Sequence, residues 1–207
     1  MINELIKNGL SITALENLSY KSSLGKSLAN SLRKFKKDAI FDEIESIIQF
    51  YQESEVLEEI DLDYRIKSKD SCLRKYQKYY PEMRLEKTLN DILGFRMLVN
   101  NYDDLIAELD MFKIRIADMS GGKSIDDGYR GIHIYYQIDH SCYPIEIQAN
   151  TYYDRQINNW LHKYLYKKEY PNAIGRILRE KYEAGKIINE KMFKEELENV
   201  LFSSKEI

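Results

Sequence analysis

Three apolar stretches in the middle of the chain constrain its fold most. They are "ILGFRMLV" (92–99), "YRGIHIYYQI" (129–138) and "YPIEIQ" (143–148). In the last two, apolar residues alternate with polar ones, which is the period of a β-strand with one buried face. Two more short strands are expected at "DYRIKS" (63–68) and "FKIRIAD" (112–118). The sequence therefore predicts a small sheet of about five strands.

Helical periodicity surrounds these strands. Helices are expected over 22–37, 39–53, 102–111 and 152–168, from Ser71 as an N-cap, and in two closing segments. The predicted fold class is α+β, a mixed sheet of about five strands flanked by helices. We expect one domain over 1–207, with basic N-terminal helices (1–40), a catalytic core (40–170) and C-terminal helices (171–207).

Composition indicates a soluble globular protein, because 43% of the 207 residues are hydrophobic and 31% are charged. No signal peptide and no apolar run of membrane length appear, so a cytoplasmic protein without a membrane partner is expected. Cys72 and Cys142 lie far apart without a CxxC spacing, which indicates a reducing compartment more than a disulfide framework.

Charge is unevenly distributed along the N-terminal third. Residues 21–37 carry six basic residues and no acidic one, whereas residues 38–63 carry ten acidic residues and no basic one. Two faces with different partners would explain this switch of sign. The alternative is a pair of solvated helices that attract each other.

A basic stretch and two separated acids are the candidates for chemistry. "YRIKSKDSCLRK" (64–75) gathers cations around a helix N-terminus, a suitable seat for a polyphosphate, although an exposed basic helix is the simpler reading. Asp91 stands at the mouth of an apolar strand, where an acid is often only a cap. In "YPIEIQ", Ile145 and Ile147 face the core, which places Glu146 and Gln148 together on the other face. Two carboxylates at such a sheet suit Mg²⁺ held against phosphates.

The segment "DDGYRGIHIYYQ" (126–137) has a polar beginning for a strand. Gly128 allows a tight turn before it. Tyr129 and His133 share one face, which would bring an aromatic platform and an imidazole beside Glu146 if that face also carries the carboxylate. Each is an ordinary strand residue alone; together with the basic helix they outline a site for a nucleotide and a second group stacked beside it.

Five motifs in this order resemble one family: "RIKSKDSCLRK", "DILGFR", "GYRGIH", "EIQANT" and "HKYLYK". They are similar to the synthetase domain of RelA/SpoT homologues, the alarmone synthetases, over roughly residues 40–170. The resemblance implies a nucleotidyltransferase-like fold. It also implies an ATP-dependent pyrophosphokinase that moves the pyrophosphate of ATP to a ribose hydroxyl with Mg²⁺.

The resemblance also implies roles for individual residues. Asp91 and Glu146 correspond to the catalytic, metal-binding carboxylates. The positions matching the ATP-binding motif are Arg65, Lys67, Ser71, Lys75 and Arg96. Tyr129 matches the tyrosine that stacks on the acceptor base, and the neighbouring acceptor positions are Arg130, His133, Gln148 and His162.

Departures from the family pattern favour one subfamily. No Pro-Lys pair precedes "DDGYRG", Gly131 replaces the usual serine, and Asn150 replaces the usual arginine. Each change removes a polar or cationic side chain that could contact the acceptor, so an acceptor with few terminal phosphates is favoured. The sequence in this respect resembles the toxic small alarmone synthetases, several of which pyrophosphorylate the 3′-CCA end of tRNA and block aminoacylation.

Three functions remain open. The first is a toxin that modifies tRNA, with its tRNA backbone contacts at Arg33, Lys34, Lys36 and Lys37. No His-Asp pair of a hydrolase is present, so the product would not be destroyed and an antitoxin partner is expected. The second is a small alarmone synthetase that makes (p)ppGpp or (p)ppApp. The third is a silent nucleotide- or RNA-binding module, which would have no need of the full set of site residues.

Overall fold

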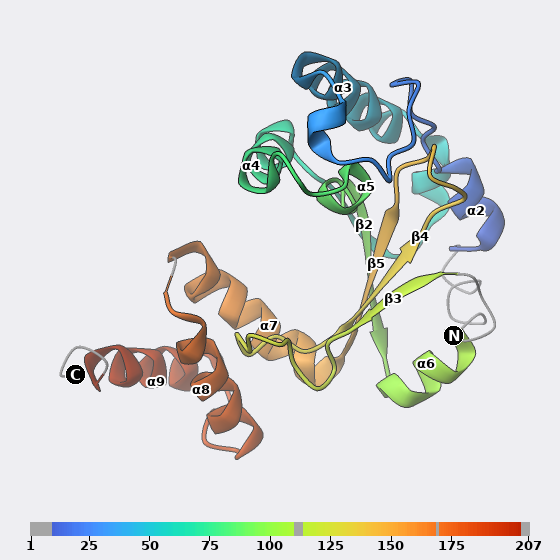
Figure 1. Ribbon diagram of the computed structural model, residues 1–207. Coiled ribbons are helices and arrows are strands. Elements are labelled where there is room, and N and C mark those ends of the chain that lie inside the picture. The colour runs from blue at the N-terminus through green and yellow to red at the C-terminus, as the bar shows by residue number, and fades with distance from the viewer. Residues whose placement is uncertain (1–9, 110–113, 169, 204–207) are drawn as a thin grey trace. The chain divides into compact units, whose positions relative to one another are not determined.

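The computed structural model describes residues 10–109, 114–168 and 170–203 (Figure 1). Residues 110–113, at the end of the expected helix 102–111 and the start of the expected strand 112–118, lie outside the described residues. The elements, in chain order, are α2 (Ile12–Asn17), the 3-10 helix η1 (Leu32–Lys34), α3 (Lys37–Gln52), the 3-10 helix η2 (Glu55–Glu59), β1 (Asp63–Ile66), α4 (Lys69–Tyr79), α5 (Leu85–Thr88), β2 (Leu93–Val99), α6 (Tyr102–Leu109), β3 (Arg115–Asp118), β4 (Ile132–Tyr136), β5 (Ile145–Thr151), α7 (Tyr152–Tyr164), the 3-10 helix η3 (Tyr166–Lys168), α8 (Asn172–Glu183) and α9 (Glu190–Ser203).

The strands form one five-stranded sheet in the order β1-β2-β5-β4-β3. β1 pairs antiparallel with β2, and Arg65 lies opposite Gly94 in that register. β2 buries alternate residues, so Phe95 and Met97 face the core while Arg96 is exposed. This α+β arrangement, a mixed sheet with flanking helices, confirms the predicted fold class.

Helices α3 and α7 follow the predicted periodicity closely. In α3, Ile40, Ile44 and Ile47 are fully buried, as the spacing of an amphipathic helix requires. Thr151 caps α7, because its hydroxyl accepts a hydrogen bond of 3.1 Å from the Asp154 amide. Trp160 and Leu161 of α7 are buried as expected.

The expected helix over 22–37 is wrong. Apart from the short η1, this segment is irregular, and its backbone amides pair with other segments. Ser22 donates to the Ser141 carbonyl over 2.8 Å and Leu28 donates to the His140 carbonyl over 2.7 Å. Gly25, with a φ of 66°, adopts the left-handed conformation that breaks a helix. Pairing with distant loops therefore overrides the local periodicity.

Ser71 is not the N-cap of α4. The helix begins at Lys69, and the extended residue before it is Ser68. The Ser71 amide already donates to the Ser68 carbonyl over 3.0 Å, so Ser71 lies inside the first turn. Its hydroxyl accepts hydrogen bonds from the Ser68 hydroxyl over 2.9 Å and from Arg74 over 3.0 Å.

The strand predicted over 129–138 is shorter, because β4 spans only Ile132–Tyr136. β5 is longer than predicted and continues to Thr151. The residues before β4 form a loop whose backbone groups bond to side chains of α7 and β5, as described below.

Contacts divide the described residues into two compact units. One comprises those up to Met97, those of 103–116 and His133–Gln148; the other comprises Leu98–Tyr102, Ala117–Ile132 and those from Ala149 onward. The second unit has its own apolar core, which includes Trp160 of α7 and Phe193 of α9. Figure 1 shows helices α7, α8 and α9 of this unit. The three-part single domain over 1–207 stays a prediction. In the described ranges, no helix is long and apolar enough to cross a membrane.

Candidate active site

Asp91 is held by two lysines from different elements. The Lys67 ammonium, just after β1, lies 2.5 Å from Asp91 Oδ2, and the Lys75 ammonium of α4 lies 2.9 Å from Asp91 Oδ1. Lys75 also donates to the Asn90 amide oxygen over 2.8 Å. Burial alone would raise the pKa of Asp91, but the two ammonium groups lower it below the ordinary value. Asp91 is therefore an ionised carboxylate at neutral pH.

Glu146 is a buried carboxylate at the second position of β5, with only 6% of its surface exposed. His133 Nδ1, from the neighbouring β4, lies 3.0 Å from Oε1, and the Gln148 amide donates to Oε2 over 2.8 Å. Burial raises the pKa of Glu146 most, but the hydrogen bond and electrostatic effect of His133 and the hydrogen bond from Gln148 together outweigh it, so the pKa is lower than usual. The predicted common face of Glu146 and Gln148 is confirmed by their hydrogen bond.

Both carboxylates open into one small hollow on the sheet. Arg65, Arg96 and Phe95 complete its lining together with Gln148. Gly94 forms its floor: a Cβ atom there would lie 3.6 Å from Glu146 Oε2, so larger side chains would fill the space. Thus Arg65, Arg96, Asp91 and Glu146 meet as predicted, and Lys67 and Lys75 reach the site through Asp91. Ser71 is not among the lining residues.

The oxygen atoms of this hollow match the ligands that Mg²⁺ prefers. Mg²⁺ usually takes one or two protein carboxylates and completes its shell with substrate phosphates and water. Asp91 and Glu146 supply two carboxylates that are close enough for the charge of Asp91 to raise the pKa of Glu146. Among the described residues no cluster of three or more His, Cys, Asp or Glu side chains forms a complete protein cage. The donor set therefore fits a metal that is shared with a phosphate substrate.

The loop that carries Tyr129 neutralises its own cations. The Arg130 guanidinium makes two hydrogen bonds to Asp126, of 2.8 and 3.0 Å, and a third of 2.9 Å to the Tyr129 carbonyl. Lys123 pairs with Asp127 over 2.6 Å, and its ammonium lies 5.0 Å from the centre of the Tyr129 ring. The hydrogen bonds from Arg130 hold the pKa of Asp126 below its usual value. Neither cation of this loop is free of an acidic partner.

Gly131 and Asn150, two departures from the family pattern, are coupled in space. The Asn150 amide donates to the Arg130 carbonyl over 2.9 Å. A Cβ atom at Gly131 would lie 2.4 Å from the Asn150 amide nitrogen and 2.8 Å from the Tyr129 hydroxyl. A side chain at 131 would require the Asn150 and Tyr129 side chains to shift from these positions, so Gly131 leaves room for Asn150.

The predicted acceptor residues lie in both compact units. His133 and Gln148 contact Glu146 in the first unit, whereas Tyr129 and Arg130 belong to the second. His162 is exposed on α7. That Tyr129, Arg130, His133, Gln148 and His162 bind one acceptor together stays a prediction.

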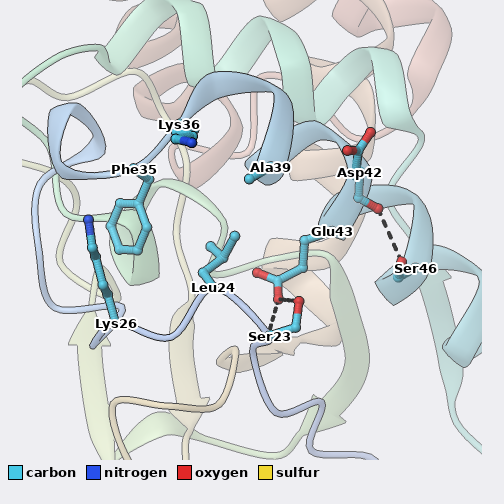
Figure 2. Close-up of a pocket in the computed structure, with 9 residues that line it drawn as sticks. All are labelled: Ser23, Leu24, Lys26, Phe35, Lys36, Ala39, Asp42, Glu43 and Ser46. Atoms are coloured by element: carbon cyan, nitrogen blue, oxygen red, sulfur yellow. Dashed lines mark hydrogen bonds between the residues drawn. The ribbon is translucent and has the colours of Figure 1, made fainter.

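The four cations proposed for tRNA lie around the start of α3. Arg33 pairs with Glu82 over 2.9 Å, and Lys37 lies over the Phe41 ring, 5.3 Å from its centre. The Lys34 carbonyl accepts a hydrogen bond from Lys26. Lys36 is the residue before α3 and lines a pocket of about 450 Å³ (Figure 2).

That pocket has a buried acid on one wall. Figure 2 shows Glu43 hydrogen-bonded to Ser23, and the Tyr143 hydroxyl also donates to Glu43 over 2.7 Å. These bonds satisfy the carboxylate internally. Lys26, Lys36 and the exposed Asp42 also line the pocket. Arg33 pairs with Glu82, which lies outside the acidic run 38–63.

Tyr135 and Arg115 adjoin the site but were not predicted. The Tyr135 hydroxyl lies 3.4 Å from His133 Nδ1, and burial together with the charge of Glu146 raises the pKa of Tyr135. The Arg115 guanidinium of β3 lies 3.8 Å over the Tyr135 ring. Strand alternation could have placed Tyr135 on the same face as His133. Arg115 could not be found in this way, because it belongs to a different strand, β3.

Comparison with known proteins identifies a family for this chain. Residues 64–170, just over half of the 207-residue chain, match the family described as "Region found in RelA / SpoT proteins". No curated protein matches.

Several solved structures are similar at low identity. The product-bound small alarmone synthetase 1 of Bacillus subtilis has 18% identity and a TM-score of 0.44, covering 80% of this chain and 89% of that one. Small alarmone synthetase 2 of Bacillus subtilis has 21% identity and a TM-score of 0.42, covering 82% and 92%. A GTP pyrophosphokinase family protein of Streptococcus pneumoniae has 23% identity and a TM-score of 0.41, covering 66% and 78%. Likenesses of this size carry nothing about substrate.

A pair of carboxylates flanked by arginines and lysines is compatible with an enzyme that handles phosphate groups. The chain belongs to the RelA/SpoT family, and as a member with the synthetase motifs in place it is a pyrophosphokinase.

Proposed function

We propose that this chain is the toxin of a toxin–antitoxin pair, which acts in the cytoplasm. It transfers pyrophosphate from ATP to the 3′-CCA end of tRNA and so blocks aminoacylation and translation. The supporting observation is the pairing within the acceptor loop, where Arg130 is bound to Asp126 and Lys123 to Asp127. A nucleoside di- or triphosphate would need cations for its terminal phosphates, and this loop offers them already neutralised. The 3′ end of a polynucleotide carries no such phosphates.

In this proposal the first unit binds ATP. Arg65, Lys67, Lys75 and Arg96 hold the triphosphate, since pyrophosphate transfer depends on charge neutralisation and in-line positioning more than on covalent help. Asp91 and Glu146 would hold Mg²⁺, which neutralises charge on the phosphates when bound. His133 and Gln148 keep Glu146 ionised and fixed in orientation. Ser71 is kept as a further ATP contact by its motif position alone.

The second unit supplies the acceptor platform in this proposal. Tyr129 stacks on the terminal base, because every base offers a π-face to an aromatic ring. The cations at Arg33, Lys34, Lys36 and Lys37 grip the backbone of the acceptor stem. An antitoxin protein restrains the activity.

The acceptor is tested directly with γ-labelled ATP. The protein is incubated with deacylated tRNA, and in parallel with GDP, GTP and AMP. We expect label on intact tRNA, none on tRNA from which the CCA end has been removed, and none with Glu146→Ala protein. Label that appears on a free nucleotide instead establishes the alternative, a small alarmone synthetase making (p)ppGpp or (p)ppApp, with which the family match is equally consistent.

A further inference from the structure

The loop that carries Tyr129 is fixed by hydrogen bonds from α7, η3 and α8. Its backbone groups bond to side chains instead of to a neighbouring strand. The Arg130 amide donates to Asn158 Oδ1 over 3.3 Å, and the Arg130 carbonyl accepts from the Asn158 amide over 2.7 Å. The Tyr166 hydroxyl donates to the Asp127 carbonyl over 3.3 Å. All of these residues belong to the second compact unit.

Arg179 of α8 connects these contacts. Its side chain is completely buried, with 0% of its surface exposed. Nε donates to the Gly128 carbonyl over 2.8 Å, Nη1 lies 2.6 Å from Asp154 Oδ1, and Nη2 donates to Asn158 Oδ1 over 3.0 Å. One planar guanidinium thus binds the loop directly and also orients the asparagine that holds Arg130.

The Arg179 charge is compensated without solvent. Asp154 forms the ion pair with Arg179. Asp154 in turn accepts hydrogen bonds from the Tyr102 hydroxyl, over 2.7 Å, and from the Thr151 hydroxyl, over 2.8 Å. A buried arginine that lost these partners would be strongly unfavourable, so the contacts favour this one position of the Arg179 side chain.

Two glycines let α8 approach the loop closely. A Cβ atom at Gly175 would lie 2.0 Å from the Asp127 carbonyl oxygen, and one at Gly128 would lie 2.3 Å from the Gly175 carbonyl oxygen. The backbones of α8 and of the loop therefore touch, and no side chain can be added at either position without separating them.

We propose that Arg179 is a positioning residue for the acceptor: with Gly175 it clamps the loop 127–130 and so fixes the Tyr129 ring as a binding platform. The proposal rests on the proposed function, because it needs Tyr129 to bind the acceptor. Arg179 touches neither substrate. Its effect is transmitted through the Gly128 carbonyl and Asn158.

The test compares Arg179→Met, Arg179→Lys and Gly175→Ala with the wild-type protein. The matched control is Lys181→Met, which removes another cation–carboxylate pair of α8, that with Glu196. Three quantities are measured: KM and kcat with deacylated tRNA (GDP if labelling identifies GDP), the Kd of ATP, and hydrogen exchange at the Tyr129 and Arg130 amides.

We expect Arg179→Met and Gly175→Ala to raise the acceptor KM about tenfold or more, since small misplacements of a binding group are costly. In both variants the Kd of ATP should be unchanged and hydrogen exchange at the Arg130 amide should be faster. The acceptor KM of Arg179→Lys should lie between those of the wild-type protein and Arg179→Met. An acceptor KM equal to that of Lys181→Met, with exchange at Arg130 no faster, would overturn the clamp. If Arg179→Met does not fold, Arg179→Lys and Gly175→Ala decide by the same criteria. If the wild-type protein transfers label to no acceptor, the proposed function is wrong. The clamp is tested separately, because hydrogen exchange at the Arg130 amide that is as slow in the variants as in the wild-type protein would refute it.

Discussion

At the residue scale, the site is set by how each ionisable side chain is paired. Asp91 and Glu146 are both buried enough to be costly as charges, yet both have pKa values below their ordinary ones because lysines or a histidine donate to them. In the loop that carries Tyr129, Asp126 and Asp127 pair with Arg130 and Lys123. In both places the ionised side chains are balanced by partners within the protein.

Replacing either carboxylate should abolish pyrophosphate transfer. For Asp91→Ala and Glu146→Ala we expect the rate to fall on the order of a hundredfold or more, because charge stabilisation of the phosphates is lost. Transfer from γ-labelled ATP measures the rate, and thermal melting confirms that the protein is folded. Near-normal turnover by a folded Glu146→Ala protein would remove Glu146 from the catalytic site.

Removing only the charge of Asp91 should destabilise the protein in a pH-dependent way. The folded-state pKa of Asp91 is depressed below 3.8, so its pairing with Lys67 and Lys75 stabilises the fold above that pH and is lost as pH falls through the folded value. We expect Asp91→Asn to cost about 1–3 kcal/mol at neutral pH. The difference in Tm from wild type should shrink in acid. A difference that is constant with pH, or one equal to that of the exposed Asp61→Asn, would contradict this pairing.

Tyr129 should contribute to acceptor recognition alone. If its ring stacks on the acceptor base, Tyr129→Ala loses about 1–3 kcal/mol of acceptor binding, whereas Tyr129→Phe loses much less. Acceptor KM and ATP Kd are measured separately. A Tyr129→Ala protein that binds ATP poorly and handles the acceptor normally would assign this tyrosine to the other substrate.

At the scale of elements, the start of α3 is the feature with a testable partner. Lys36 and Lys37 precede or begin this helix, while Asp38 already lies in its first turn. A helix N-terminus favours negative charge, so acidic residues there are compatible with the helix. Loss of the Lys37–Phe41 contact costs only about 0.5–1 kcal/mol at an exposed site. The element can therefore be recharged without unfolding it.

Changing Lys36 and Lys37 to Glu should cripple tRNA modification while leaving ATP affinity and Tm nearly unchanged. Each lost phosphate contact should lower the slope of log activity against log salt by roughly 0.7–0.9. The control is Lys186→Glu with Lys191→Glu, an equal change of charge at exposed positions of the second unit. If the acceptor is a free nucleotide, changing Lys36 and Lys37 to Glu should have little effect on transfer activity. A large fall in Tm would show instead that these cations serve the fold.

At the scale of the whole molecule, the residues proposed to bind ATP and the loop proposed to bind the acceptor belong to separate compact units. The hollow lined by Asp91 and Glu146 lies in the first unit, and the contacts of Arg179 with the loop lie in the unit that contains α7, α8 and α9. Stability of the second unit depends on its own apolar core, in which Phe193 is fully buried and lies 5.6 Å from Trp160 between ring centres.

Phe193→Ala should therefore destabilise the second unit by about 3–5 kcal/mol, the usual cost of removing a buried aromatic ring. Fluorescence of Trp160, the one tryptophan of the chain, reports the unfolding of this unit. The control is Phe202→Ala on the same helix, which is 68% exposed and should change stability by no more than about 0.5 kcal/mol. Equal melting curves for the two variants would mean that α9 does not complete this core.

What the sequence determined by itself is local. Strand alternation placed Glu146 with Gln148, and helical spacing placed Ile44 with Ile47, because strand and helix geometry fix which neighbours share a face. The motif order gave the family, and the sheet of five strands follows from the same patterns.

The tertiary structure alone decided the rest, because it depends on partners distant in sequence. Residues 22–37 have helical spacing, but their amides bond to Ser141 and His140, and no local pattern reveals that preference. The sequence did not show that Asp126, four residues earlier, pairs with Arg130, because the loop conformation brings the two side chains together. Arg179 gave no signal at all, since a buried arginine is recognisable only when the carbonyl and carboxylate that satisfy its charge and its hydrogen bonds are in place.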